Sequence, residues 1–125
     1  MSGSLAARAA VEALRKVTSS FDGAEERQGQ IDMSAAIAES LASGRSIIVQ
    51  AGTGTGKSLG YLVPALLNGK KTVVATATKT LQDQLHRNDL PLLAQHLGID
   101  FTWAVIKGRS NYVCKQRVNE LSDKS

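Results

Sequence analysis

The chain has 125 residues, a length that suits one domain with one hydrophobic core. Hydrophobic residues make up 42% but aromatic residues only 4%, so any core must be mainly aliphatic, which favours an α/β domain. The formal charge of +4 is compatible with nucleic-acid binding without indicating it. No long uncharged apolar run is present, so we expect no membrane span, and a single cysteine excludes an internal disulfide and fits a reducing compartment.

Residues 1–20 favour an amphipathic helix, followed by a linker that ends near residue 23. Small and aliphatic side chains recur on one face of this helix, and charged side chains lie on the other. The apolar face holds Ala6, Ala10, Ala13, Leu14 and Val17. The basic, serine-rich composition also resembles an organelle transit peptide, although an ordinary first helix is the preferred interpretation.

A second helix is predicted from about residue 24 to residue 42, with Gly44 as its stop signal. Its apolar arc extends to Leu41 and Ala42. Arg27 and Gln30 interrupt the pattern, because they are polar and lie on the side that faces the protein. Such a pair either contacts a nucleotide base or extends from the helix end to water, and the periodicity favours neither interpretation.

Residues 51–58 read A-G-T-G-T-G-K-S and follow a predicted strand at 47–50. This is a relaxed form of the phosphate-binding loop, because Ala51 occupies the first position instead of glycine. The glycines let backbone N–H groups turn around a polyphosphate. Lys57 supplies a positive charge for the β- and γ-phosphates, and the hydroxyl of Ser58 is suited to ligate Mg²⁺.

Two more strands and several helices are predicted beyond this loop. A helix at 57–66 is kinked or ended by Pro64, and strands follow at 72–76 and 102–106. Between them lie a helix at 79–87 and a second helix that starts at Pro91 and stops at Gly98; a short helix is expected near 113–121. This order predicts right-handed crossovers and a parallel sheet flanked by helices. Loops 51–58, 77–79 and 107–109 should then meet at one edge of the sheet.

None of the predicted strands ends in the carboxylate that a nucleotide hydrolase uses to hold Mg²⁺. The remaining acidic candidates, Asp83, Asp89 and Asp100, fall on predicted helices or turns and are expected on the solvated surface. We therefore expect the chain to bind nucleotide but to hydrolyse it poorly, as the opening portion of a larger enzyme.

Four blocks of sequence together resemble one known family. They are R-Q-G-Q-x-x-M at Arg27–Met33, A-G-T-G-T-G-K-S at Ala51–Ser58, T-A-T-K-T-L-Q-D-Q-L at Thr76–Leu85 and K-G-R-S-N-Y-V-C at Lys107–Cys114. In this order they resemble the XPD/DinG group of superfamily 2 DNA helicases, most closely its bacterial DinG-like branch. The resemblance implies part of a RecA-like domain, from an ATP-dependent helicase that moves 5′→3′ on DNA and acts in repair or replication.

The resemblance also implies roles for individual residues. Arg27 and Gln30 match a motif that recognises adenine, and Lys57 and Ser58 match the catalytic contacts to triphosphate and Mg²⁺. The implied ATP-binding set is Arg27, Gln30, Ala51, Gly52, Thr53, Gly54, Thr55, Gly56, Lys57 and Ser58. Motif Ia, which contacts single-stranded DNA, is matched by Thr76, Thr78, Lys79 and Gln82; Thr78 is also suited to cap a helix.

Cys114 matches the first of four cysteines that hold a [4Fe–4S] cluster in the family. The resemblance places the first part of the motor domain at 24–110 and the start of an iron–sulphur domain at 111–125. One thiolate cannot hold four irons, so the cluster is expected in the full-length protein only. The implied partners are ATP, Mg²⁺ and single-stranded or forked DNA, in the bacterial cytoplasm at the nucleoid. The alternatives are a binding module without turnover and an unrelated P-loop ATPase.

Overall fold

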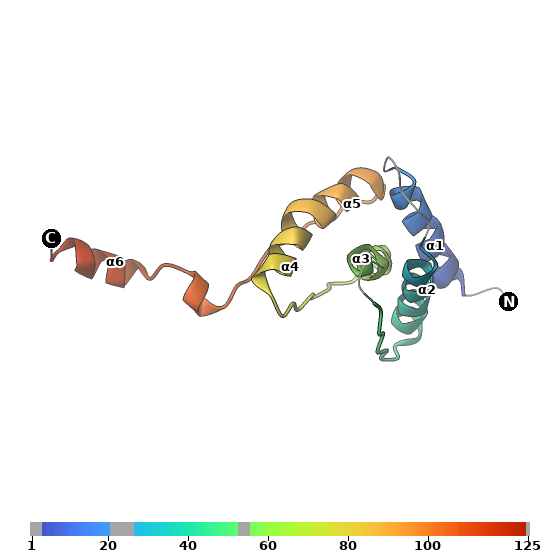
Figure 1. Cartoon of the computed structure of the whole chain (residues 1–125), viewed down its shortest axis with the longest axis horizontal. Coiled ribbons are helices and arrows are strands. Elements are labelled where there is room, and N and C mark those ends of the chain that lie inside the picture. Colours follow the sequence, from blue (N-terminus) through green and yellow to red (C-terminus); the bar gives the residue numbers. More distant parts are fainter. Residues whose placement is uncertain (1–3, 21–26, 53–55, 125) are drawn as a thin grey trace.

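The structure is a computed structural model that describes residues 4–20, 27–52 and 56–124. Its elements are α1 (Leu5–Thr18), α2 (Gln28–Ser43), α3 (Lys57–Leu67), α4 (Lys79–Gln84), η1 (Leu85–Asp89), α5 (Leu90–His96), η2 (Arg109–Asn111) and α6 (Lys115–Ser122). Figure 1 shows α1, α2 and α3 grouped together, with the run from α4 to α5 beside them and α6 set apart near the C-terminus.

The core lies between α1, α2, α3 and the run from η1 to α5. It consists of Leu14, Val17, Ile31, Leu62, Val63, Leu85, Leu93 and Leu97. Each such side chain contributes about 1.5–3 kcal/mol when it is fully buried. α2 and α3 approach closely at Gly60, where an added Cβ would lie 2.8 Å from Cε of Met33. The helical layer is therefore held together by aliphatic packing between elements that are distant in sequence.

The first predicted helix is confirmed as α1. Ser4 caps it by accepting a hydrogen bond from the N–H of Ala7 at 3.1 Å. Ala7, Ala10, Leu14 and Val17 are buried, so the apolar face is the expected one except that Ala7 is buried more deeply than Ala6. The basic side chains in the last turn suit the negative end of the helix.

The second predicted helix is confirmed as α2 within the described residues, and it ends at Gly44 as expected, with a φ of 72°. The apolar arc was predicted to reach its last turn, and this was wrong. Leu41 and Ala42 are exposed. Ser34 lies fully buried in the middle of the helix, although it was not expected in the core.

Pro64 does not end a helix, whereas Pro91 lies in the first turn of α5, where a helix was predicted to start. α3 continues through Pro64, which is buried, to Leu67. The helices predicted at 79–87 and from Pro91 onward form one run, because a single π-helical turn joins them. In that turn the N–H of Leu90 donates to the carbonyl of Leu85, which closes a wider hydrogen-bonded ring than that of an α-helix. This wider turn accommodates Pro91, which has no N–H to donate. Gly98 follows α5 with a φ of 78° and is the stop signal that the sequence predicted.

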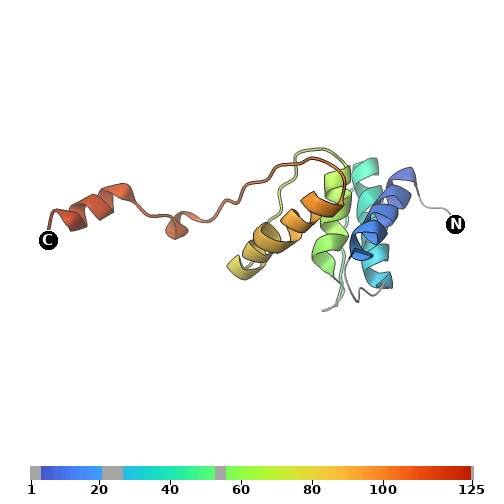
Figure 2. The ribbon, with the colours of Figure 1, turned by 90° about the horizontal axis from the view of Figure 1, so that it is seen from above.

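No β-strand occurs in residues 4–20, 27–52 and 56–124, so the predicted parallel sheet is not confirmed. The segments 47–50, 72–76 and 102–106 run as irregular connections, visible in Figure 2 as thin lines that join the helices. A strand exists only when a second segment accepts and donates its backbone hydrogen bonds, and these three segments do not pair. Their side chains are correspondingly open to solvent: Ile48 is 100% exposed and Val73 88%.

Beyond the third segment, α6 lies apart from the other helices in both views. It confirms the short helix predicted near 113–121. Among the described residues, no helix is long and apolar enough to cross a membrane.

Candidate nucleotide site

The end of the predicted phosphate-binding loop contacts α2. Gly56 precedes α3 with a φ of 70°, a left-handed conformation that favours glycine. The side-chain amide of Gln30 donates to the carbonyl oxygen of Gly56 at 2.8 Å, and Gln30 is only 4% exposed. A Cβ at position 56 would lie 2.2 Å from Nε2 of Gln30, so the two residues fit only because position 56 has no side chain.

Arg27 lies at the same place. Its Nη1 would be 3.3 Å from a Cβ at Gly56, and its backbone begins α2. Gln30 therefore does not extend to water, one of the two interpretations that periodicity had left open. It instead contacts the end of the predicted phosphate-binding loop, and no local sequence pattern could show this because the two residues are 26 positions apart.

The other residues of the loop are only partly described. Ala51 is half-buried, Gly52 is exposed, and Thr53, Gly54 and Thr55 lie outside the described residues. Lys57 opens α3 with its side chain exposed, and Ser58 follows it half-buried. A free ammonium group and a hydroxyl thus stand at the positive end of an 11-residue helix, the position at which phosphates bind.

Ser58 has two polar neighbours. They are the phenol of Tyr61, one turn along α3, and the carboxyl of Asp89, the last residue of η1. Burial raises the pKa of Asp89 above its ordinary value, and hydrogen bonds from Gln84 and Ser58 oppose the rise. Burial also raises the pKa of Tyr61. The expectation that Asp89 is a solvated surface residue was wrong.

The four residues that match motif Ia lie around the start of α4. Thr78 caps this helix by accepting from the N–H of Leu81 at 3.2 Å, as predicted, and the hydroxyl of Thr76 donates to the carbonyl of Thr78 at 3.0 Å. Gln82 donates from Nε2 to the carbonyl of Ile106 at 2.9 Å, and Lys79 is exposed. Three of the four side chains therefore use a polar group inside the chain.

Further contacts attach residues 103–107 to α4 and η1. Lys107 pairs with Asp83 at 3.2 Å, so Asp83 is not simply solvated as expected, whereas Asp100 is exposed. The indole N–H of Trp103 donates to Nδ1 of His86 at 2.9 Å. Of the three loops expected at one edge, the second and third thus meet through α4, and the first contacts this run through Asp89 instead.

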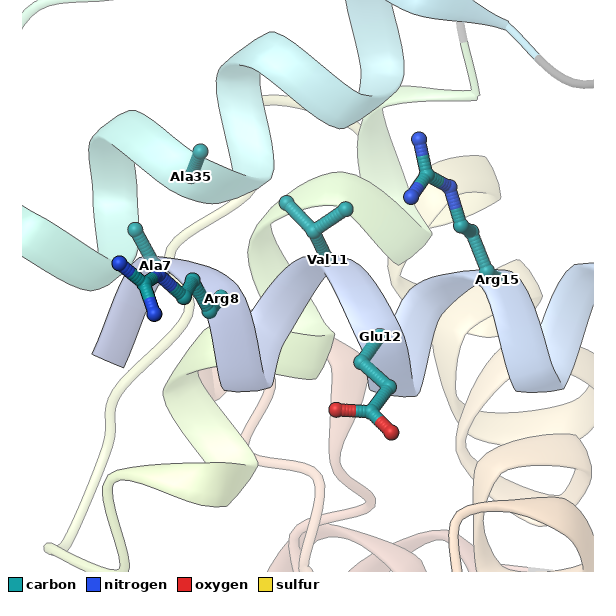
Figure 3. A pocket seen from close by; sticks show the side chains of 6 residues that line it. All are labelled: Ala7, Arg8, Val11, Glu12, Arg15 and Ala35. Carbon is teal, nitrogen blue, oxygen red and sulfur yellow. The ribbon is translucent and has the colours of Figure 1, made fainter. Parts of the chain in front are cut away.

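Cys114 precedes α6 and is exposed. Within the described part of the chain, no three side chains of His, Cys, Asp or Glu come together as metal ligands. A surface hollow of about 440 Å³ lies along α1 and α2 and is lined by Ala7, Arg8, Val11, Glu12, Arg15 and Ala35 (Figure 3). It shares no residue with the predicted motifs, and Glu12 and Val11 leave opposite sides of α1.

Comparison with known proteins places the chain. The model of the family described as DEAD/DEAH box helicase matches residues 31–123. The chain is 39% identical over 106 residues to ATP-dependent DNA helicase YoaA of Haemophilus influenzae, which covers 85% of the chain and 17% of that relative. It is 44% identical over 105 residues to ATP-dependent helicase DinG of Mycobacterium tuberculosis, with coverage of 78% and 16%.

A third relative, 3'-5' exonuclease DinG of Bacillus subtilis, is 33% identical over 103 residues, covering 79% of the chain and 11% of the relative. The chain thus spans less than a fifth of the length of these three proteins, with coverage of 17%, 16% and 11%. No solved structure matches it. With a match to the family model over residues 31–123, this chain belongs to the DEAD/DEAH box helicase family.

Proposed function

We propose that this chain is the ATP-binding opening portion of the first motor domain of a DinG-like, ATP-dependent DNA helicase. The observation that carries the proposal is the contact between Gln30 and Gly56, which links the two blocks expected to hold adenine and phosphate. Gly56, which ends the loop and precedes α3, lies close to both Arg27 and Gln30. The names of the relatives, which include two ATP-dependent helicases, support the same function.

The residues fit ATP with Mg²⁺. The left-handed backbone of Gly56 turns the chain into α3, so that the free N–H groups of the helix and the ammonium of Lys57 can bind phosphate oxygens. The hydroxyl of Ser58 supplies one oxygen ligand of the kind Mg²⁺ prefers. Bound Mg²⁺ would neutralise charge on the phosphates. The polar groups of Arg27 and Gln30 stand where a base attached to those phosphates could be recognised.

We also propose that the exposed Lys79 at the start of α4 contacts the phosphates of single-stranded or forked DNA, with Thr76, Thr78 and Gln82 shaping the surface around it. Unwinding with 5′→3′ polarity, a role in repair and a cytoplasmic location belong to the proposed longer protein. Cys114 would be one cluster ligand there. This chain has a single cysteine, so its own residues do not fit a four-iron cluster. We propose that the chain alone binds ATP without appreciable turnover.

The test is binding of a fluorescent ATP analogue to the 125-residue chain with Mg²⁺. Lys57→Ala should weaken binding at least tenfold, because the lysine meets the phosphates directly. Lys124→Ala, which removes an exposed lysine beyond α6, is the matched control and should bind like the unsubstituted chain. Equal affinities for the two variants, or no saturable binding by the unsubstituted chain, would contradict the proposal.

A second test uses a fluorescent oligonucleotide of single-stranded DNA. Lys79→Ala should reduce its affinity and lower the dependence of binding on salt, because one fewer counterion is released. Lys124→Ala again controls for net charge. If the two variants weaken binding equally, the DNA contact is not localised at α4.

A further inference from the structure

Side chains of α4 and η1 hold the connection 103–107, which follows α5 in the sequence. Each of three residues in this helical run contacts one residue of the connection. The pairs are Gln82 with Ile106, Asp83 with Lys107 and His86 with Trp103, at 2.9, 3.2 and 2.9 Å. The connection is therefore attached to the run at three points, and the chemistry of the three contacts differs.

The hydrogen bond between Trp103 and His86 has only one possible direction. An indole nitrogen donates and never accepts, so Nδ1 of His86 must carry a free lone pair. The ring proton of the neutral imidazole then resides on Nε2. An imidazolium carries a proton on both ring nitrogens and cannot accept a hydrogen bond. This contact therefore exists only while the imidazole of His86 is neutral.

The connection is fixed separately at its start, by Phe101. This side chain packs against the hydrophobic core, and its ring lies 5.6 Å from the ring of Trp103 at an angle of 39°. Trp103 is 37% exposed and His86 is exposed. Water can therefore hydrate both the imidazolium and the indole N–H once their bond is lost, so that no unpaired polar group is left buried.

The charged and titratable groups around His86 belong to its own run, to the connection and to α3, which packs against η1. On the run they are Lys79, Asp83, Arg87, Asp89 and His96, on the connection Lys107, and on α3 Lys57 and Tyr61. Asp83 is already paired with Lys107. Among the described residues, no carboxylate forms an ion pair with His86 that could replace the lost bond.

We propose that His86 and Trp103 form a pH-sensitive latch between η1 and the connection 103–107, closed while the imidazole is neutral and open when it gains a proton. When the latch opens, Trp103 leaves the run and Phe101 stays on the core. The segment that leads to η2 and Cys114 then loses one of its three attachments to the helices. The latch involves neither ATP, Mg²⁺ nor DNA, so it is independent of the proposed function.

Trp103 is the single tryptophan of the chain, so tryptophan fluorescence reports on the latch directly. Between about pH 8 and about pH 5, the interval in which histidines change charge, its emission should shift to longer wavelength and its quenching by acrylamide should increase. His86→Asn should abolish both changes, because the amide oxygen lies near the position of Nδ1 and accepts from the indole at any pH. His96→Asn, which removes the other histidine, is the matched control and should retain both changes.

Circular dichroism over the same pH range separates opening of the latch from acid unfolding, and the helical signal should stay constant. A loss of helix that coincides with the fluorescence change would overturn the inference, and so would a fluorescence change that His86→Asn retains. Weaker emission without stronger acrylamide quenching would also overturn it, because the imidazolium would then quench a tryptophan that has not moved.

A second measurement needs no substitution and serves if His86→Asn does not fold. The indole N–H of Trp103 gives the single indole signal in an NMR spectrum of the chain. Its resonance should move as the pH falls, because the indole exchanges an imidazole nitrogen for water as its acceptor. A resonance that is unchanged between the two ends of the pH range would contradict the latch.

Discussion

The molecule has two halves, the packed helices and the connections between them, and Val63 and Val73 illustrate the difference. Val63 lies in α3 and is 0% exposed, whereas Val73 lies in the connection after α3 and is 88% exposed. The side chains are identical and both belong to apolar runs. A helix forms all its backbone hydrogen bonds within one segment, so α3 can be placed whole against α1 and α2. An apolar segment of strand type has no such bonds until another segment pairs with it, and apolar composition alone does not bury it.

The same contrast between helices and connections applies to the contacts of the candidate site. The long-range hydrogen bond at the candidate nucleotide site joins one helix to the start of another: Gln30 of α2 donates to Gly56, which precedes α3. The motif Ia residues lie where a connection enters a helix, and there the contacts are mostly local. The following variants test whether helices carry the stability of the chain and the connections do not.

The largest effect is expected at Leu93 in α5, which is 0% exposed. Leu93→Ala should lower the free energy of unfolding by about 2–5 kcal/mol, because it removes buried methyl groups and leaves a cavity. Leu5→Ala is the control, since Leu5 is 83% exposed in α1. Urea denaturation followed by circular dichroism measures both. Similar losses for the two variants would contradict the packing described for α5.

An intermediate effect is expected at Gly56. Gly44 and Gly56 have φ values of 72° and 70°, so alanine at either should cost about 1–2 kcal/mol of stability in this conformation. Gly56→Ala should cost more, because its Cβ would displace Gln30, whereas nothing lies within 4 Å of a Cβ at Gly44. Thermal unfolding of both variants measures the difference. The excess should disappear when each is combined with Gln30→Ala, and its persistence would show that Gln30 is not the obstacle.

The smallest effect is expected at Ile48, which is 100% exposed. Ile48→Ala should change the free energy of unfolding by less than about 0.5 kcal/mol, because no packing is lost. Val63→Ala, a truncation in the core, should cost about 2 kcal/mol by comparison. The midpoints of urea denaturation of the two variants measure this difference. A loss at Ile48 as large as that at Val63 would mean that segment 47–50 is buried in solution, and would move the boundary between the two halves.

Much of the helical half could be predicted from sequence, because its signals are local. Thr78 as a cap, and Gly44 and Gly98 as helix stops, occur where the pattern indicated them. Pro91 lies at the start of α5 as predicted, whereas Pro64 does not end α3, since the loss of one N–H is tolerated when a helix is held by its buried face. The predicted sheet failed for the opposite reason: β-branched composition indicates an extended segment, but pairing depends on another segment.

By itself, the sequence determined the cap at Thr78, the helix stops at Gly44 and Gly98 and the resemblance to the family, because each depends on residue types at short, regular spacing. Only the tertiary structure decided that Gln30 donates to Gly56 and that Asp89 is half-buried where η1 packs on α3. The hydrogen bond joins residues 26 positions apart, and both results depend on the aliphatic packing that sets how α2, η1 and α3 lie against one another. Periodicity reports which face of a helix is buried, but not which partner that face will meet.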